Sequence, residues 1–125
     1  MMKKYTAFVL LFAVALGAFA QTKPTAKKEQ DYYEIKTLPI PKEIYLEVGG
    51  LATMPDGRLA VSTRRGEIWI VENPYQKSSH QTYYRRFASG LHEVLGLAYK
   101  DGAFYCSQRG ELTKISDTDR DGVAD

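Results

Sequence analysis

Two stretches of the chain repeat one pattern, and this repeat restricts the possible folds more than any other feature. "EVGGLATMPDGRLAVSTRRGEIWIV" (47–71) aligns with "EVLGLAYKDGAFYCSQRGELTKI" (93–115), with two single-residue gaps. The offset is about 45 residues, which is typical of propeller repeats in which each unit is one four-stranded sheet. Both copies consist of short β-rich runs separated by turn residues, so the sequence predicts an all-β fold of successive antiparallel sheets.

Turn signals set the order of strands within a copy. In the first copy, a small-residue strand at 49–53 leads into an Asp-Gly turn, where glycine supplies the positive φ of a tight hairpin. A second strand is expected at 58–63, a third at 67–72 after an Arg-Gly turn, and a fourth at 82–88. The second copy repeats only the first three strands, at 95–99, 103–108 and 111–116.

The N-terminal segment has the pattern of a secretory signal peptide over residues 1–20. Two lysines precede the apolar run "AFVLLFAVAL", and small residues at Ala18 and Ala20 frame a cleavage point before Gln21. A transmembrane anchor is the alternative, but the run is shorter than the roughly 20 residues that a spanning helix needs. We therefore expect an exported protein, periplasmic or extracellular in a bacterium, with no membrane span in its mature form.

Residues 21–31 ("QTKPTAKKEQD") are polar and lack apolar periodicity, so they are expected to form a flexible spacer. From residue 32 the chain alternates polar with apolar or aromatic residues and contains Pro39 and Pro41. This pattern predicts an edge strand or an extended lead-in to the β domain, which spans 32–125.

Charge and cysteine content exclude several classes of protein. Removal of residues 1–20 takes away two lysines and leaves 15 basic and 15 acidic side chains. A neutral chain lacks the net basic face that nucleic acid or an anionic membrane surface requires. The single cysteine, Cys106, rules out an intrachain disulfide framework.

The stretches "LATMPDGRLAVSTRRGEIWIVENP" (51–74) and "ASGLHEVLGLAYKDGAFYCSQRGEL" (88–112) resemble the glucose/sorbosone dehydrogenase-like β-propellers of exported bacterial proteins. They also resemble the related propeller modules that are fused to cytochrome c or blue-copper domains. The resemblance covers 39–125 and implies a six-bladed propeller. Some members of that superfamily bind pyrroloquinoline quinone (PQQ) and calcium and oxidise sugars.

The resemblance implies that the catalytic histidine and quinone-binding residues lie in later blades, so no catalytic residue is assigned here. On this basis the chain is expected to be the N-terminal part of an incomplete propeller, with about two blades and with any enzymatic activity in the absent part. One alternative is a non-enzymatic propeller that binds carbohydrate or protein partners or scaffolds fused redox domains. Another is a calcium-stabilised structural or adhesion module.

A set of polar side chains is expected at one rim of the repeats, because strand starts and the turns between second and third strands open on the same face. The set comprises Glu47, His92 and Glu93 at strand starts and Arg64, Arg65 and Arg109 in the turns. Two interpretations are open: a polar funnel for an anionic or polyhydroxylated ligand, or Glu–Arg pairs between neighbouring blades that satisfy buried charge. His92 by itself is more typical of a loop than of a catalytic site.

The stretch "DTDRDGVAD" (117–125) has the ligand spacing of a calcium loop and is expected on the face opposite the rim. Carboxylates occupy loop positions 1, 3, 5 and 9, glycine takes the sharp turn at position 6, and a carbonyl serves position 7. The bidentate acid of position 12 would fall three residues beyond Asp125. The alternative is a solvated acidic turn. The expected ligands are Asp117, Asp119, Asp121, Val123 and Asp125.

Cys106 aligns with Val61 in a central strand, which favours a buried filler over a redox role. The strand aromatics are equally typical of half-buried sheet positions and of a platform for stacking sugars; they are Trp69, Tyr83, Tyr84 and Tyr105.

Overall fold

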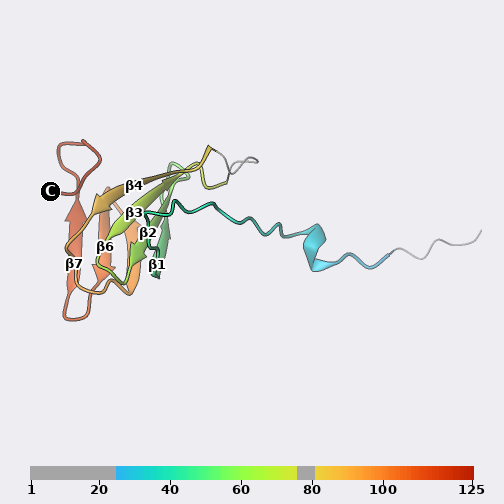
Figure 1. The fold of residues 1–125 in the computed structure, drawn as a ribbon, viewed down its shortest axis with the longest axis horizontal. Coiled ribbons are helices and arrows are strands. Elements are labelled where there is room, and N and C mark those ends of the chain that lie inside the picture. The colour runs from blue at the N-terminus through green and yellow to red at the C-terminus, as the bar shows by residue number, and fades with distance from the viewer. Residues whose placement is uncertain (1–24, 76–80) are drawn as a thin grey trace, which may run out of the picture. The chain divides into compact units, whose positions relative to one another are not determined.

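The computed structural model describes residues 25–75 and 81–125, so the expected signal peptide lies outside the described residues. Within these ranges seven strands form two antiparallel sheets, and the fold is all-β as predicted (Figure 1). No helix in the described part of the chain has the length and apolar character needed to cross a membrane.

The first sheet has four strands in sequential order, β1-β2-β3-β4, all antiparallel. All four lie where the turn signals predict them. Their bounds are Val48–Thr53 (β1), Leu59–Thr63 (β2), Ile68–Glu72 (β3) and Tyr83–Ala88 (β4).

The second sheet repeats this arrangement with three strands in the order β5-β6-β7. Both Asp-Gly turns have glycine in the left-handed region, Gly57 at φ 85° and Gly102 at φ 81°, which confirms the predicted hairpins. The strand bounds are Gly96–Lys100 (β5), Ala103–Ser107 (β6) and Leu112–Ser116 (β7).

The described segment before β1, residues 25–47, belongs to no sheet. It contains one 3₁₀ turn, η1 (Glu29–Asp31), where the Lys28 N–H donates to the Asp31 carboxylate at 2.8 Å. Between residues 32 and 47 no strand forms, so the edge-strand alternative is wrong and the extended lead-in is correct. Pro39 and Pro41 cannot donate backbone hydrogen bonds, which explains why this stretch does not pair.

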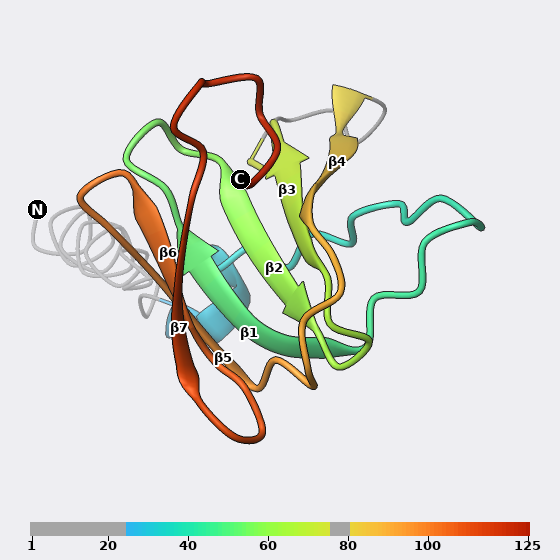
Figure 2. The same ribbon diagram turned by 90° about the vertical axis from the view of Figure 1, so that its left-hand side faces the viewer.

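The core lies between the two sheets, which pack face to face with β1 and β2 in contact with β5 (Figure 2). Phe104 is 1 % exposed and stacks edge-to-face with Phe87 at 5.0 Å and with Tyr99 at 4.8 Å between ring centroids. The other buried members of the cluster are Met54, Ala60, Ile68, Ile70, Val94, Cys106 and Ile115.

The two sheets approach each other closely where glycine occupies β1. A Cβ atom on Gly49 would lie 1.9 Å from the Val94 carbonyl oxygen, and one on Gly50 would lie 2.7 Å from the Leu97 nitrogen. No side chain fits there, because real Cβ atoms do not come within 3.0 Å of backbone atoms. The small-residue strand of the first copy therefore allows the backbones of β1 and β5 to meet.

Cys106 lies in this core with no exposed surface, and burial, assisted by the Glu111 charge, raises the pKa of its thiol. Because the thiolate is the reactive form, we expect Ellman's reagent to label the folded protein at least about 100-fold more slowly than the urea-unfolded protein. Equal labelling rates in the two states would contradict the buried position. A free cysteine analogue in the same urea concentrations controls for effects on the reagent.

Candidate functional site

The predicted rim residues of the first copy lie together. The Arg64 N–H donates to the Glu47 carbonyl at 2.8 Å, which joins the β2–β3 turn to the start of β1. The Glu47 carboxylate then pairs with Arg64 at 3.3 Å and approaches Arg65 at 4.0 Å. The Arg65 guanidinium lies 4.7 Å from the centre of the Tyr45 ring, a cation–π contact.

The second copy repeats this arrangement. The Arg109 N–H donates to the His92 carbonyl at 3.1 Å, and the Arg109 guanidinium pairs with the Glu93 carboxylate at 3.6 Å. Each Glu–Arg pair therefore forms within its own repeat, and the expectation of buried pairs between neighbouring blades is wrong. The pairs are also exposed, with more than 40 % of each side chain accessible, so solvent screening leaves them little effect on stability.

Sequence reasoning missed Gln108, which organises the rim of the second copy. Its side-chain oxygen accepts from the His92 N–H, and its amide nitrogen donates to Glu111 and Thr113. In the first copy Thr63 occupies the equivalent position, and its hydroxyl accepts from the Glu67 N–H at 3.1 Å. A polar residue at the end of the second strand in both copies was the available signal.

At the opposite end of the sheets, the 117–125 loop folds around its own aspartates. The Asp117 carboxylate accepts from the Gly122 N–H at 2.9 Å, and the Asp119 carboxylate accepts from the Asp121 N–H at 3.1 Å. Arg120 and Gly122 adopt left-handed φ values of 65° and 91°, which close the turn. Short polar side chains that bond forward to the backbone therefore hold the carboxylates on the inner side of the loop.

Three of the five predicted ligands converge. Asp117, Asp119 and Asp125 each offer a carboxylate oxygen, and these oxygens lie within 4.8 Å of one another. Asp121 is not in this group; its carboxylate accepts from the Val123 N–H at 2.8 Å. Val123, whose carbonyl is the fifth predicted ligand, is half exposed.

The two end carboxylates of the group differ in their surroundings. Oδ1 of Asp117 is buried and has no hydrogen-bond partner among the described residues. The Asp125 carboxylate accepts from both the hydroxyl and the backbone N–H of Thr118, and these bonds lower the pKa of Asp125. An unpaired buried carboxylate oxygen is costly, and a bound cation is one way to satisfy it.

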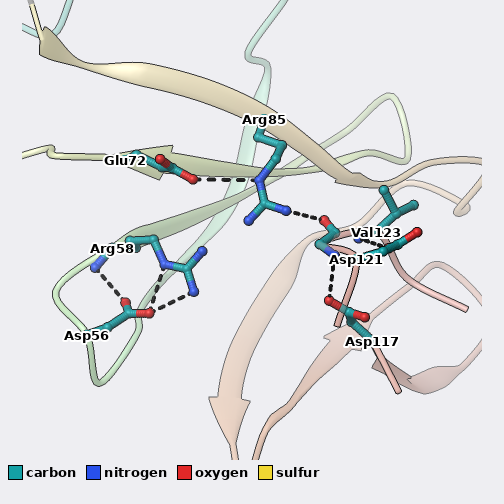
Figure 3. A network of polar contacts seen from close by, with 8 residues as sticks. Asp56, Arg58, Glu72, Arg85, Asp117, Asp121 and Val123 are labelled. Atoms are coloured by element: carbon teal, nitrogen blue, oxygen red, sulfur yellow. Dashed lines mark hydrogen bonds and ion pairs between the residues drawn. The ribbon is translucent and has the colours of Figure 1, made fainter. Parts of the chain in front are cut away.

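The loop makes hydrogen bonds to both sheets. Arg85 of β4 donates to the Gly122 carbonyl at 2.7 Å while it pairs with Glu72 of β3 at 3.6 Å (Figure 3). Further along, the Ala124 N–H donates to the Phe87 carbonyl in the first sheet at 2.8 Å. The Asp125 N–H donates to the Ser116 carbonyl in the second sheet at 3.1 Å.

A groove of about 600 Å³ lies beside the loop, between the sheets, with an apolar floor that includes Phe87 and Phe104. Arg58 and Arg85 lie on one side and Asp117 and Asp121 on the other. Arg58 is held by Asp56 at 2.7 Å, and the hydrogen bond from Arg58 lowers the pKa of that carboxyl. Arg58 and Arg85, the arginines of the first sheet that line this groove, are thus paired with protein groups.

No protein-family model, curated protein or solved structure matches the chain.

Proposed function

We propose that the 117–125 loop binds a calcium ion and that the ion fastens the second β sheet to the first. The observation that carries this proposal is the buried, unpaired Oδ1 of Asp117 beside the carboxylates of Asp119 and Asp125. Calcium takes six to eight oxygen ligands, and carboxylates in a tight turn are its usual partners in proteins. The donor set contains no nitrogen or sulfur, which favours a hard cation over zinc or copper.

The position of the loop supports a structural role for the ion. Backbone bonds from Ala124 and Asp125 reach one sheet each, and Arg85 holds the Gly122 carbonyl. A cation that fixes the aspartates also fixes these three contacts, because all of them lie within the nine residues of the loop. Calcium release is then expected to loosen the contacts of the loop with Phe87 and Ser116 before either sheet unfolds.

The two sheets are proposed to be adjacent blades of an exported β-propeller. The repeat, the sequential order of the antiparallel strands and the contact between β1 and β5 support this architecture. Quinone-dependent sugar oxidation is supported by the resemblance alone. The rim arginines are paired with Glu47 and Glu93, and we assign no described residue to PQQ. The geometry therefore favours a calcium-stabilised structural or binding module.

The proposal predicts saturable calcium binding and calcium-dependent stability. At free calcium 100 times above Kd, binding adds about 2.7 kcal/mol to the unfolding free energy. For a domain of this size that corresponds to a rise in Tm of roughly 10–20 °C. Calorimetric titration and thermal melts of protein purified from an exporting host test both values. Magnesium is the control, because its demand for octahedral geometry predicts at least about tenfold weaker binding.

The proposal would be overturned by an unchanged melting temperature and no heat of binding at about 10 mM calcium. This concentration lies well above the Kd range of extracellular calcium modules.

A further inference from the structure

Arg85 is a charged side chain at an inward-facing position of the first sheet. It is paired across β3 and β4 with Ile70, which is 1 % exposed. Directly paired residues share one face of a sheet, so Arg85 starts on the same side as this core residue. It is partly buried there, and its guanidinium reaches the 117–125 loop (Figure 3). A charged group in this position loses part of its hydration, which its contacts must offset.

One peptide group of the loop, between Gly122 and Val123, is held at both ends. Arg85 donates to its carbonyl oxygen at 2.7 Å, and its N–H donates to the Asp121 carboxylate at 2.8 Å. Glycine has more backbone freedom than any other residue, so contacts of this kind decide how the group is oriented. The bond from Arg85 and the bond to Asp121 therefore support each other.

The guanidinium of Arg85 also fills the space beside Gly122. A Cβ at position 122 would overlap Nη1 of Arg85, so any other residue would displace the guanidinium. Gly122 has a φ of 91°, and its N–H donates to Oδ2 of Asp117 at 2.9 Å. A fixed Gly122 thus keeps Oδ2 of Asp117 engaged, while Oδ1 has no partner among the described residues.

The positive charge of Arg85 has the opposite effect on a cation in the loop. Like charges repel, so removal of a nearby positive charge alone strengthens cation binding. Glu72 pairs with Nε of Arg85 at 3.6 Å, which reduces the repulsion. Because the orienting effect and the charge effect of Arg85 have opposite signs, the direction of a change in calcium affinity distinguishes them.

We propose that Arg85 is a positioning residue that sets which carboxylates of the loop face the calcium ion. Its bond to the Gly122 carbonyl keeps Asp121 on the backbone and leaves the three converged carboxylates for the ion. This inference rests on the proposed calcium site, and it makes the calcium affinity depend on a residue of the first sheet that binds no ion itself. Loss of a group that orients metal-binding side chains typically lowers metal affinity by roughly 10–100-fold.

Arg85→Met tests the proposal, because methionine keeps a long unbranched apolar side chain but lacks the charge and the donor. Positioning predicts that the calcium Kd rises by roughly 10–100-fold. Loss of the charge alone predicts a lower Kd. Calorimetric calcium titration of the full exported chain measures the Kd, at a temperature where circular dichroism shows that the sheets of each variant are folded. Arg85→Leu removes the same charge and donor and gives the same test if the methionine variant does not fold.

Arg58→Met is the matched control for charge. Arg58 lines the same groove but pairs with Asp56 at 2.7 Å, and no hydrogen bond joins it to the described loop residues. Its substitution removes an equal charge from the groove, so the calcium Kd should stay the same or fall. A rise as large as that of Arg85→Met would overturn the proposal, because the bond to Gly122 would then not be the cause.

The outcomes separate this inference from the proposed function. An Arg85→Met variant that binds calcium as tightly as the unmodified chain, or more tightly, overturns the positioning role and leaves the calcium site in place. A lower Tm with an unchanged Kd does the same, since Arg85 would then act on stability alone. An unmodified chain that binds no calcium overturns the proposed function and this inference together.

Discussion

Asp117→Asn is expected to abolish the calcium response of the protein while both sheets remain folded. Asparagine keeps one oxygen that can accept from the Gly122 N–H, so the turn is retained. It removes the negative charge and, with its oxygen kept on the Gly122 N–H, places an amide donor where Oδ1 now lies. We expect calcium affinity to fall by roughly 100-fold or more, equivalent to about 2.7 kcal/mol of binding free energy.

Although Asp117→Asn lowers calcium affinity, it is not expected to lower the stability of the calcium-free protein. Without a cation, Oδ1 of Asp117 is a buried acceptor with no partner among the described residues, and its charge destabilises the loop. Asp117→Asn should therefore melt at the same temperature as the unmodified apo protein or higher, with no further rise on addition of calcium. Calorimetric titration and melts at several calcium concentrations measure both effects.

Asp101→Asn is the matched control for charge. Asp101 is exposed, lies in the β5–β6 turn and has a left-handed φ of 51°, a conformation that asparagine tolerates. Its substitution should leave calcium binding unchanged. If Asp117→Asn bound calcium as tightly as the unmodified chain, the loop would not be the binding site and the proposed fastening role would be lost.

The strands could be predicted because the signals that set them are local. Alternating apolar residues and Asp-Gly or Arg-Gly turns recur in both copies, and each signal acts within a few residues. The lead-in was ambiguous for the same reason, since 32–47 alternates like a strand while its two prolines oppose pairing. Only the tertiary structure shows that residues 32–47 form no backbone pairing with a neighbouring strand.

The site was predictable in part. Three aspartates of the loop converge as its spacing indicates, but Asp121 turns its carboxylate to the Val123 N–H. Asp117, Asp119 and Asp121 all accept from a backbone N–H of the loop, so the spacing alone does not decide which of these carboxylates faces the shared centre. Arg85 could not be found at all, because its partner Gly122 lies 37 residues away and no pattern joins them.

Gly66→Ala and Gly110→Ala are expected to have opposite effects although both glycines occupy the same repeat position. Gly66 has a φ of 80°, and an added Cβ would lie 1.8 Å from the Leu91 carbonyl oxygen. The left-handed conformation costs an alanine roughly 1–2 kcal/mol, and moving the backbone around the new atom costs about 1–3 kcal/mol more. Gly110 has no positive φ, and nothing lies within 4 Å of its Cβ position.

Urea unfolding followed by circular dichroism measures this difference. Gly66→Ala should lower the unfolding free energy by roughly 2–5 kcal/mol, a large share of the total stability of a small domain. Gly110→Ala should be neutral or stabilise by up to about 1 kcal/mol, because alanine restricts the unfolded chain. Equal midpoints would contradict the close contact at Leu91.

The two glycines differ because the chain leading into the second repeat packs on Gly66. The Gly66 N–H donates to the Thr63 carbonyl, and the Gly66 carbonyl accepts from the Leu91 N–H. Sequence equivalence within a repeat therefore does not imply equal constraint; what packs on each copy decides it.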